Sequence, residues 1–327
     1  MVTSIGAADE TYRRHDISAW VTLFAEKGGS TPSTWLQDPE DKEVRWLHKD
    51  TTIPSNGHEQ GEDWSEVLST QVAYALGVPA AQVRLCTRNG RRGSLSRNVR
   101  PDADDLFEGR FALEECPRVA GYYSHREGLP GRDPSRPEIQ RPGHTVANIK
   151  LALDTIGAPP GFTGPPTLGA FDVFTGYLVL DALIANRDRH EENWALLLPR
   201  LEGRQDRLAP SYDHASSLGY NLMDEARAKL LGDPASLRRW AERGTAYRFE
   251  HSKRPVTLVE LAVQALKTCD ALGRRHWKER VAELDLHQVH EALGTRAIPE
   301  MSEVACNFAA AVLDLNLRRL RDAIARA

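Results

Sequence analysis

The sequence of 327 residues lacks the features that mark membrane-spanning and secreted proteins. No apolar run reaches the roughly 18 residues that a transmembrane helix needs. The N-terminus has no charged stretch followed by an apolar core, so we expect no secretory signal. The four cysteines are far apart and form no Cys-x-x-Cys pair, which favours free thiols over disulfides or a zinc site. Together these absences predict a cytoplasmic protein without a membrane span.

An excess of charge of one sign is also missing. The 42 basic residues are balanced by 46 acidic residues, and the net charge is −4. This balance provides no basic field that would favour nucleic acid as a partner. One local group of arginines surrounds the turn at Asn89 and Gly90, and it forms either a solvated hairpin rim, the simpler interpretation, or an anion-binding surface. Its members are Arg88, Arg91, Arg92, Arg97 and Arg100.

Strand signals dominate the first part of the chain. The alternation of apolar and polar residues predicts strands at 21–24, 34–37, 44–49, 83–86 and 93–99. The Asn89-Gly90 pair predicts a tight hairpin turn between the last two of these strands. A helix is expected at 63–76, with Gly77 as its C-terminal stop.

Helical signals dominate the rest. Prolines and glycines interrupt residues 101–142, and the part at 105–111 is interpreted as the crossover between two lobes. Apolar periodicity predicts helices at 144–156, 171–185, 224–230, 234–243, 257–272 and 301–325. Strands first and helices second indicate a two-lobed α+β fold. The expected lobes are 1–110, rich in strands, and 111–327, mainly helical.

Candidate chemistry is concentrated in two segments, NRDRHEEN and SYDHASSLG. Asp188 follows the helix expected at 171–185, where a loop can present its carboxylate to an incoming hydroxyl as a general base. Asn193 and Asp213 flank two apolar runs that predict a hairpin, and their oxygens suit Mg²⁺. His190 is expected to hydrogen-bond the loop backbone. Each residue alone is an ordinary loop or turn residue, but the order Asp, Asn, Asp favours an ATP- and magnesium-dependent phosphotransferase.

A lysine in the first part is a candidate ligand for the phosphates of ATP. Lys49 ends a predicted strand, and alternation places it on the opposite face from Trp46. An acidic residue on the following helix would position it; Glu66 is the preferred partner, and Glu59 and Glu62 are alternatives. A solvated edge-strand lysine is the simpler interpretation of Lys49 taken alone.

The loop Gly28-Gly29-Ser30-Thr31 separates the first two predicted strands. Its backbone N–H groups are candidates to lie over the phosphates of ATP, although a plain hairpin turn fits equally well. It matches neither the Walker A pattern nor Gly-x-Gly-x-x-Gly. If the loop closes over ATP, the hydroxyls of Ser30, Thr31 and Ser33 would lie near the γ-phosphate, so autophosphorylation there is a hypothesis.

With these residues the chain resembles the HipA-like serine/threonine kinases. The resemblance rests on Lys49 in RWLHKD, on Glu66 in EDWSEVLSTQVAYALGVP, and on Asp188, Asn193 and Asp213 in the two segments above. It implies a protein kinase-like fold with ATP and Mg²⁺ as cofactors. It further implies that Asp188 is the catalytic base, Asn193 and Asp213 are magnesium ligands, and Lys49 binds phosphate with Glu66 as its partner. The Asp, Asn, Asp triplet is also similar to that of phosphatidylinositol kinases.

The resemblance covers roughly residues 24–219 and matches least well in the loop, where Gly28 to Ser33 would correspond to the phosphate-covering loop. The family usually carries Gln or Lys there, and this chain has Thr-Pro-Ser. The best-known members are toxins of bacterial toxin–antitoxin pairs. The resemblance therefore implies a protein substrate carrying Ser or Thr. A toxin role and an antitoxin-like regulator are further options that do not follow from the resemblance automatically.

Two further functions stay open. One is a kinase of the same fold that acts on a small molecule or lipid headgroup. The other is a nucleotide-binding regulatory module without transfer activity, which the intact triplet of Asp188, Asn193 and Asp213 disfavours. We expect the insert at 101–142 and the helices after Asp224 to shape the choice of acceptor.

Overall fold

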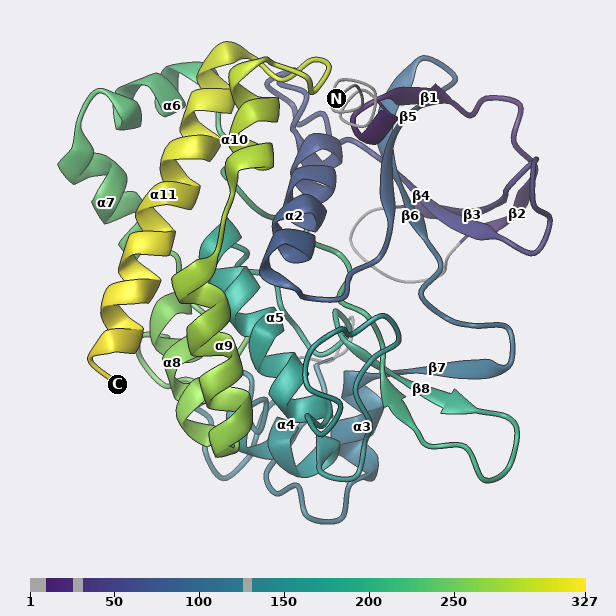
Figure 1. The fold of residues 1–327 in the computed structure, drawn as a ribbon, viewed down its shortest axis with the longest axis vertical. Helices are drawn as coiled ribbons and strands as arrows, with labels where there is room; N and C mark the ends of the chain where they lie inside the picture. The colour runs from purple at the N-terminus through teal and green to yellow at the C-terminus, as the bar shows by residue number, and fades with distance from the viewer. Residues whose placement is uncertain (1–9, 26–31, 126–130) are drawn as a thin grey trace.

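The computed structural model describes residues 10–25, 32–125 and 131–327. A sheet lies on one side of the molecule and most helices on the other, so the expected α+β arrangement is confirmed (Figure 1). The loop from Gly28 to Thr31 lies outside the described residues. The division between residues 110 and 111 stays a prediction, and helix α3 (Gly109–Glu115) runs across it.

A six-stranded sheet with the order β1-β5-β6-β4-β3-β2 forms the N-terminal part. Its strands are β1 (Arg14–Asp16), β2 (Thr22–Ala25), β3 (Ser33–Gln37), β4 (Arg45–Asp50), β5 (Val83–Arg88) and β6 (Arg91–Arg97). All five expected strands are confirmed. Asn89 (φ 49°) and Gly90 (φ 78°) both adopt left-handed conformations at the predicted turn, which suits the right-handed twist of a hairpin. Strand β1 was not expected; it is three residues long and pairs in parallel with β5.

Strand β4 explains where Lys49 lies. Trp46 and His48 are buried on one face of the strand, and Lys49 is half-buried on the other. Trp46 packs in a small core with Ile17 and Leu95. The side-chain alternation predicted from the sequence is therefore confirmed, and it directs the Lys49 ammonium away from this core.

Helix α2 (Glu62–Leu76) packs against the sheet, beside strands β5 and β6 (Figure 1). Most of its residues are buried, including Val67, Leu68 and Val72, whose exposure is 0%. The helix ends at Gly77, which has φ 85° and donates its N–H to the carbonyl of Tyr74, as the sequence predicted. This packing fixes the position of Glu66, in the middle of the helix.

Residues 105–111 form regular secondary structure within a stretch that the sequence indicated to be irregular, and their role as the crossover between the lobes stays a prediction. They belong to β7 (Asp104–Glu108) and to α3, and β7 pairs with β8 (Ala195–Pro199) in a second sheet that also contains β9 (Arg207–Leu208). Asp105 and Leu106 are both exposed, so this edge strand lacks the apolar alternation that identifies strands in a sequence. The hairpin predicted between residues 194 and 212 is confirmed by the pairing of β8 with β9.

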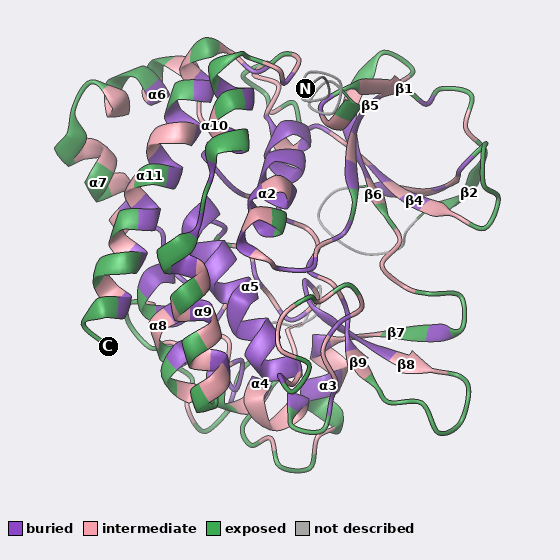
Figure 2. Ribbon diagram, in the orientation of Figure 1, coloured by how far each residue is buried: buried purple, intermediate pink, exposed green. Residues whose placement is uncertain are grey.

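Helix α5 (Ala170–Ile184) forms the centre of the helical part, and every one of its residues is buried (Figure 2). The surrounding helices are α4 (Val146–Leu153), α6 (Asp224–Leu231), α7 (Pro234–Glu242), α8 (Leu258–Thr268), α9 (Ala271–Glu283), α10 (His287–Gly294) and α11 (Glu303–Ala325). In the part of the chain that the structure describes, no helix combines the length and apolarity needed to cross a bilayer.

The helix predicted at 257–272 is too long, and two helices after it were missed. Helix α8 ends at Thr268, and Ala271 already begins α9. The charged sequence of α9 buries Gly273, Trp277 and Val281, so its apolar stripe is too narrow to be recognised from periodicity.

Candidate active site

A buried ion pair shapes the loop that carries Asp188. Helix α5 ends at Ala185 in a left-handed conformation (φ 56°). Arg189 then turns inward and binds both carboxylate oxygens of Asp181, with Nε at 2.9 Å from Oδ2 and Nη2 at 2.8 Å from Oδ1. Both side chains are only 2% exposed. The same guanidinium donates to the Asn193 carbonyl at 2.7 Å, so one arginine joins the end of α5 to the end of the loop.

Within this loop, the backbone of Asp188 is bonded to the side chain of Asn193. The Asn193 Nδ2 group donates to the Asp188 carbonyl at 2.7 Å. The Asp188 N–H in turn donates to Asn186 Oδ1 at 3.0 Å. Because Nδ2 of Asn193 is used inside the loop, Oδ1 is the atom of this amide that suits a cation.

His190 holds the loop, as expected from the sequence. Its Nδ1 accepts a hydrogen bond from the N–H of Glu192 at 3.2 Å. Burial lowers the pKa of His190 despite the opposing effect of the Asp188 carboxylate. The imidazole is therefore neutral at pH 7, the state in which a ring nitrogen can accept this bond.

Asp213 is paired with Lys49 across the two parts of the molecule. Lys49 Nζ lies 3.0 Å from Asp213 Oδ2. Displacement of water by the surrounding protein acts to raise the pKa of Asp213, but the Lys49 ammonium outweighs it and the pKa is lowered. Asp213 therefore carries a negative charge at neutral pH. Its backbone is left-handed (φ 60°), a conformation that Asp and Asn tolerate better than most residues.

Glu66 is buried and lies next to the residue that follows Asp213. Its Oε1 is 3.5 Å from Nδ1 of His214, and Nε2 of that imidazole is 2.7 Å from the Ser211 hydroxyl. His214, for which the sequence offered no signal, thus lies between Glu66 of α2 and Ser211 in the segment that leads to Asp213. The pairing of Glu66 with Lys49 stays a prediction, and both residues line the same cavity. The alternative partner Glu59 accepts a hydrogen bond from Thr51 instead, at 2.6 Å.

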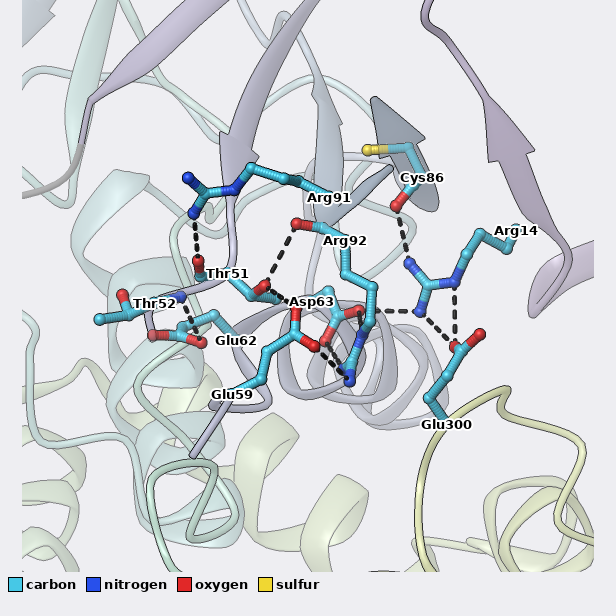
Figure 3. Close-up of polar contacts among 10 residues, drawn as sticks. All are labelled: Arg14, Thr51, Thr52, Glu59, Glu62, Asp63, Cys86, Arg91, Arg92 and Glu300. Atoms are coloured by element: carbon cyan, nitrogen blue, oxygen red, sulfur yellow. Dashed lines mark hydrogen bonds and ion pairs between the residues drawn. The ribbon is translucent and has the colours of Figure 1, made fainter. Parts of the chain in front are cut away.

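An ion-pair cluster around Asp63 holds the first turn of α2 (Figure 3). The buried carboxylate of Asp63 accepts from Arg14 of β1 at 2.8 Å and from Arg92 of β6 at 2.8 and 3.1 Å. Arg14 also bonds Glu300, ahead of α11, at 2.7 Å. The interpretation of Arg92 as part of a solvated hairpin rim is wrong, because its side chain is only 18% exposed and is paired with Asp63.

The described candidate residues converge on one cavity of about 1190 Å³. Lys49, Glu66, Asp188, Asn193 and Asp213 all line it. The cavity receives residues from β4 and α2 on one side and from the loops after α5 and β9 on the other. Gly28, Gly29, Ser30 and Thr31 stay predictions, since they lie outside the described residues.

The donor set fits a hard divalent cation. Asp213 supplies a charged carboxylate and Asn193 a neutral amide oxygen, both on the wall of the same cavity, and Mg²⁺ prefers such oxygen ligands. Mg²⁺ typically binds one or two protein groups and takes its remaining ligands from water and phosphate. Two protein oxygens are therefore sufficient for a cation that arrives with a nucleotide.

Two residues that sequence reasoning missed contact the candidate base. Arg248 places Nε at 2.7 Å and Nη2 at 2.6 Å from Asp188 Oδ1. The Tyr247 hydroxyl donates to the same oxygen at 3.2 Å. Both contacts come from the segment after α7, which is remote in sequence and carries no recognisable motif.

Comparisons with known proteins show which solved structures share this fold. No protein-family model and no curated protein matches the sequence. Among solved structures, the Helicobacter pylori proinflammatory kinase CtkA is similar with a TM-score of 0.70 and 15% identity, over 95% of this chain and 97% of CtkA.

Two other solved structures are similar at lower scores. HipA of Shewanella oneidensis, in complex with HipB and operator DNA, has a TM-score of 0.42 and 12% identity over 93% of this chain and 66% of HipA. A MAP kinase of Leishmania major has a TM-score of 0.26 and 12% identity over 94% of this chain and 82% of its own. The likeness to CtkA shows a shared fold. The protein kinase-like fold that the resemblance to HipA-like kinases implied is therefore confirmed, and this chain has the two-lobed architecture of a kinase.

Proposed function

We propose that the protein is an ATP- and magnesium-dependent phosphotransferase that phosphorylates a serine or threonine of another protein. The observation that carries the proposal is the convergence of Lys49, Asp188, Asn193 and Asp213 on one cavity. Lys49 lies far from the other three residues in the sequence, in the strand-rich part of the chain. The fold brings together an ammonium, two carboxylates and an amide oxygen in one cavity. These groups support the proposal because phosphoryl transfer requires a cation near the phosphates, a carboxylate near the acceptor hydroxyl and oxygen ligands for a metal.

Lys49, Asn193 and Asp213 would bind the nucleotide and its metal. Asn193 Oδ1 and the Asp213 carboxylate would hold Mg²⁺, which supplies charge neutralisation on the phosphate oxygens. The ion pair of Lys49 with Asp213, at 3.0 Å, keeps the ammonium at the metal-binding carboxylate. From there Lys49 is positioned to contact phosphate oxygens beside the metal.

Asp188 would receive the proton of the acceptor hydroxyl. As the hydroxyl oxygen attacks the γ-phosphorus, the bond from phosphorus to the bridging oxygen breaks and ADP leaves. Arg248 and Tyr247 both contact Oδ1 of Asp188. We therefore assign the hydroxyl to Oδ2, while the two contacts on Oδ1 hold the carboxylate in a fixed orientation.

A nucleotide-binding module without transfer activity is the second candidate. The contact of Arg248 with Asp188 at 2.6 Å favours it, because the guanidinium occupies a carboxylate oxygen that an acceptor hydroxyl could otherwise reach. An antitoxin-like regulator stays a prediction from the sequence resemblance.

Transfer of label from γ-labelled ATP to an acceptor separates these functions. The purified protein is incubated with labelled ATP, magnesium and either a protein lysate or a mixture of hydroxylated metabolites. The proposal expects labelled serine or threonine in lysate proteins, identified by mass spectrometry. Label in the metabolites alone would contradict the protein-kinase assignment. Binding of ATP with no label in either mixture would contradict transfer activity and support the regulatory module.

A further inference from the structure

Three arginines from two segments line the cavity that Asp188 also lines. Arg187 lies in the loop after α5, Arg243 follows α7, and Arg248 follows soon after. The guanidinium groups of Arg187 and Arg248 both lie against the ring of Tyr247, with their Cζ atoms 5.2 and 4.9 Å from its centroid. The ring of Tyr247 thus holds two cations beside Asp188.

Carboxylates of the described residues balance only part of the charge of these three arginines. Among the described residues, Arg187 and Arg243 have no carboxylate within ion-pair distance; Arg187 contacts the Tyr247 ring, and Arg243 donates to the Arg239 carbonyl at 3.4 Å. Arg248 has a carboxylate partner, Asp188. The group therefore holds a net positive charge at neutral pH.

Arg110, which lines the same cavity, differs from Arg187 and Arg243 because it is paired with carboxylates. Arg110 is paired with Glu108 at 2.9 Å and with Glu192 at 3.6 Å. Carboxylates are therefore present in the cavity, but among the described residues none of them pairs with Arg187 or Arg243. The cavity also receives Glu62 and Glu66 from α2, and Glu62 lies at the N–H of Thr52.

Building on the proposed function, we propose that Arg187, Arg243 and Arg248 form the acceptor subsite and select a hydroxyl that has an anionic group beside it. In a protein substrate this group is the carboxylate of Asp or Glu next to the phosphorylated Ser or Thr. Guanidinium groups bind carboxylates through paired N–H donors and hold them in a defined orientation. Arg248 contacts Asp188 directly. A substrate carboxylate bound by these arginines would therefore lie next to the acceptor hydroxyl, whose proton Asp188 receives.

Peptide substrates test this assignment in the intact protein. Three peptides carry one serine flanked by Glu, by Ala or by Lys, and each is tested with labelled ATP and magnesium at low salt, where exposed charges are least screened. Small hydroxy acids, such as glycerate, are tested in the same assay. They show whether the recognised carboxylate belongs to a peptide or to a free metabolite. The expected substrate is the Glu-flanked peptide, or the hydroxy acid if the anion belongs to a small molecule.

Charge reversal identifies the residues responsible. Arg243→Glu should raise KM for the Glu-flanked peptide about fivefold or more with kcat little changed, since the residue contacts the flanking charge and not the reacting atoms. The same variant should use the Lys-flanked peptide better than the wild type does. Arg238→Glu is the matched control: it makes the same charge change on α7, outside the cavity lining, at a side chain that is 67% exposed.

The outcomes separate this inference from the proposed function. Equal use of the three peptides, or a KM change in Arg238→Glu as large as in Arg243→Glu, would overturn the acceptor subsite and leave the kinase activity intact. A preference for the Lys-flanked peptide would also overturn it. Absence of transfer to every peptide and hydroxy acid, with ATP still bound in a thermal-shift assay, would overturn the subsite together with the proposed function.

Discussion

The ammonium of Lys49, on strand β4, lies 3.0 Å from the carboxylate of Asp213, which follows strand β9. This ion pair connects the N-terminal sheet to the segment that carries Asp213, a candidate magnesium ligand. It also explains the lowered pKa of Asp213, because the Lys49 charge exceeds the opposing effect of lost hydration. Both residues are about one-third exposed, 30% and 31%, so a nucleotide entering the cavity can reach them.

Asp213→Asn should weaken magnesium-dependent binding of ATP. The variant loses the negative charge but keeps the shape, and Asn tolerates the left-handed backbone at φ 60°. Loss of a charged partner costs ~1.5–3 kcal/mol, so affinity should fall by about tenfold to a hundredfold. Titration calorimetry with and without Mg²⁺ measures this directly. Unchanged affinity in the presence of Mg²⁺ would remove Asp213 from the metal site.

Lys49→Met should raise KM for ATP while leaving the fold intact, because methionine replaces the apolar stem and removes the charge. We expect a rise of about tenfold, from the loss of one charge-assisted contact with phosphate. Lys42→Met is the matched control, since Lys42 is exposed and lies outside the cavity lining. Equal KM values for the two variants would show that Lys49 does not bind the nucleotide.

Arg189→Ala should destabilise the protein strongly. It removes one partner of a pair in which both side chains are only 2% exposed, and it leaves the Asp181 carboxylate buried. Breaking such a pair costs ~3–5 kcal/mol of unfolding free energy. Arg238→Ala breaks an exposed pair with Glu242 and should cost less than ~1 kcal/mol. Urea denaturation of both variants measures the difference, and similar losses would refute the structural role of Arg189.

The stability of the protein should fall as the pH is lowered from 7 to 5. Burial lowers the pKa of His144 below its ordinary value of 6.5, and the ring stacks on Phe249. Below pH ~6.5 the unfolded chain binds a proton that the folded chain does not, so stability is lost, by at most ~1.4 kcal/mol per pH unit for one such group. His144→Gln should show a shallower decline in urea denaturation between these pH values. An identical decline in the variant would exclude His144 as a source.

The sequence was sufficient to identify the residues of the candidate site that lie in short local patterns. Asp188 and Asn193 occupy one loop, and Asp213 follows the next hairpin, so their order alone indicated a common site. Lys49 was placed on the correct face of β4 because side chains alternate along any strand. Local periodicity and spacing carry this kind of information without knowledge of the tertiary structure.

Contacts between distant segments were missed for a physical reason. Arg248 reaches Asp188 across 60 residues of sequence, and Arg92 pairs with Asp63 on a different element. An arginine in a sequence does not reveal whether it is solvated or buried against a carboxylate. The edge strand β7 escaped recognition in the same way, since pairing with β8 and not an apolar pattern defines it.

The central claim is tested most directly by comparing the wild type with Asp188→Ala. Transfer of the γ-phosphoryl group from labelled ATP to acceptor proteins is measured with magnesium, and ATP binding to each protein is measured in parallel. We predict that the variant binds ATP as the wild type does, while transfer falls by about 10²–10⁴-fold, the range expected for loss of a general base. Transfer by Asp188→Ala at the wild-type rate would contradict the assignment of this cavity as a phosphotransferase active site.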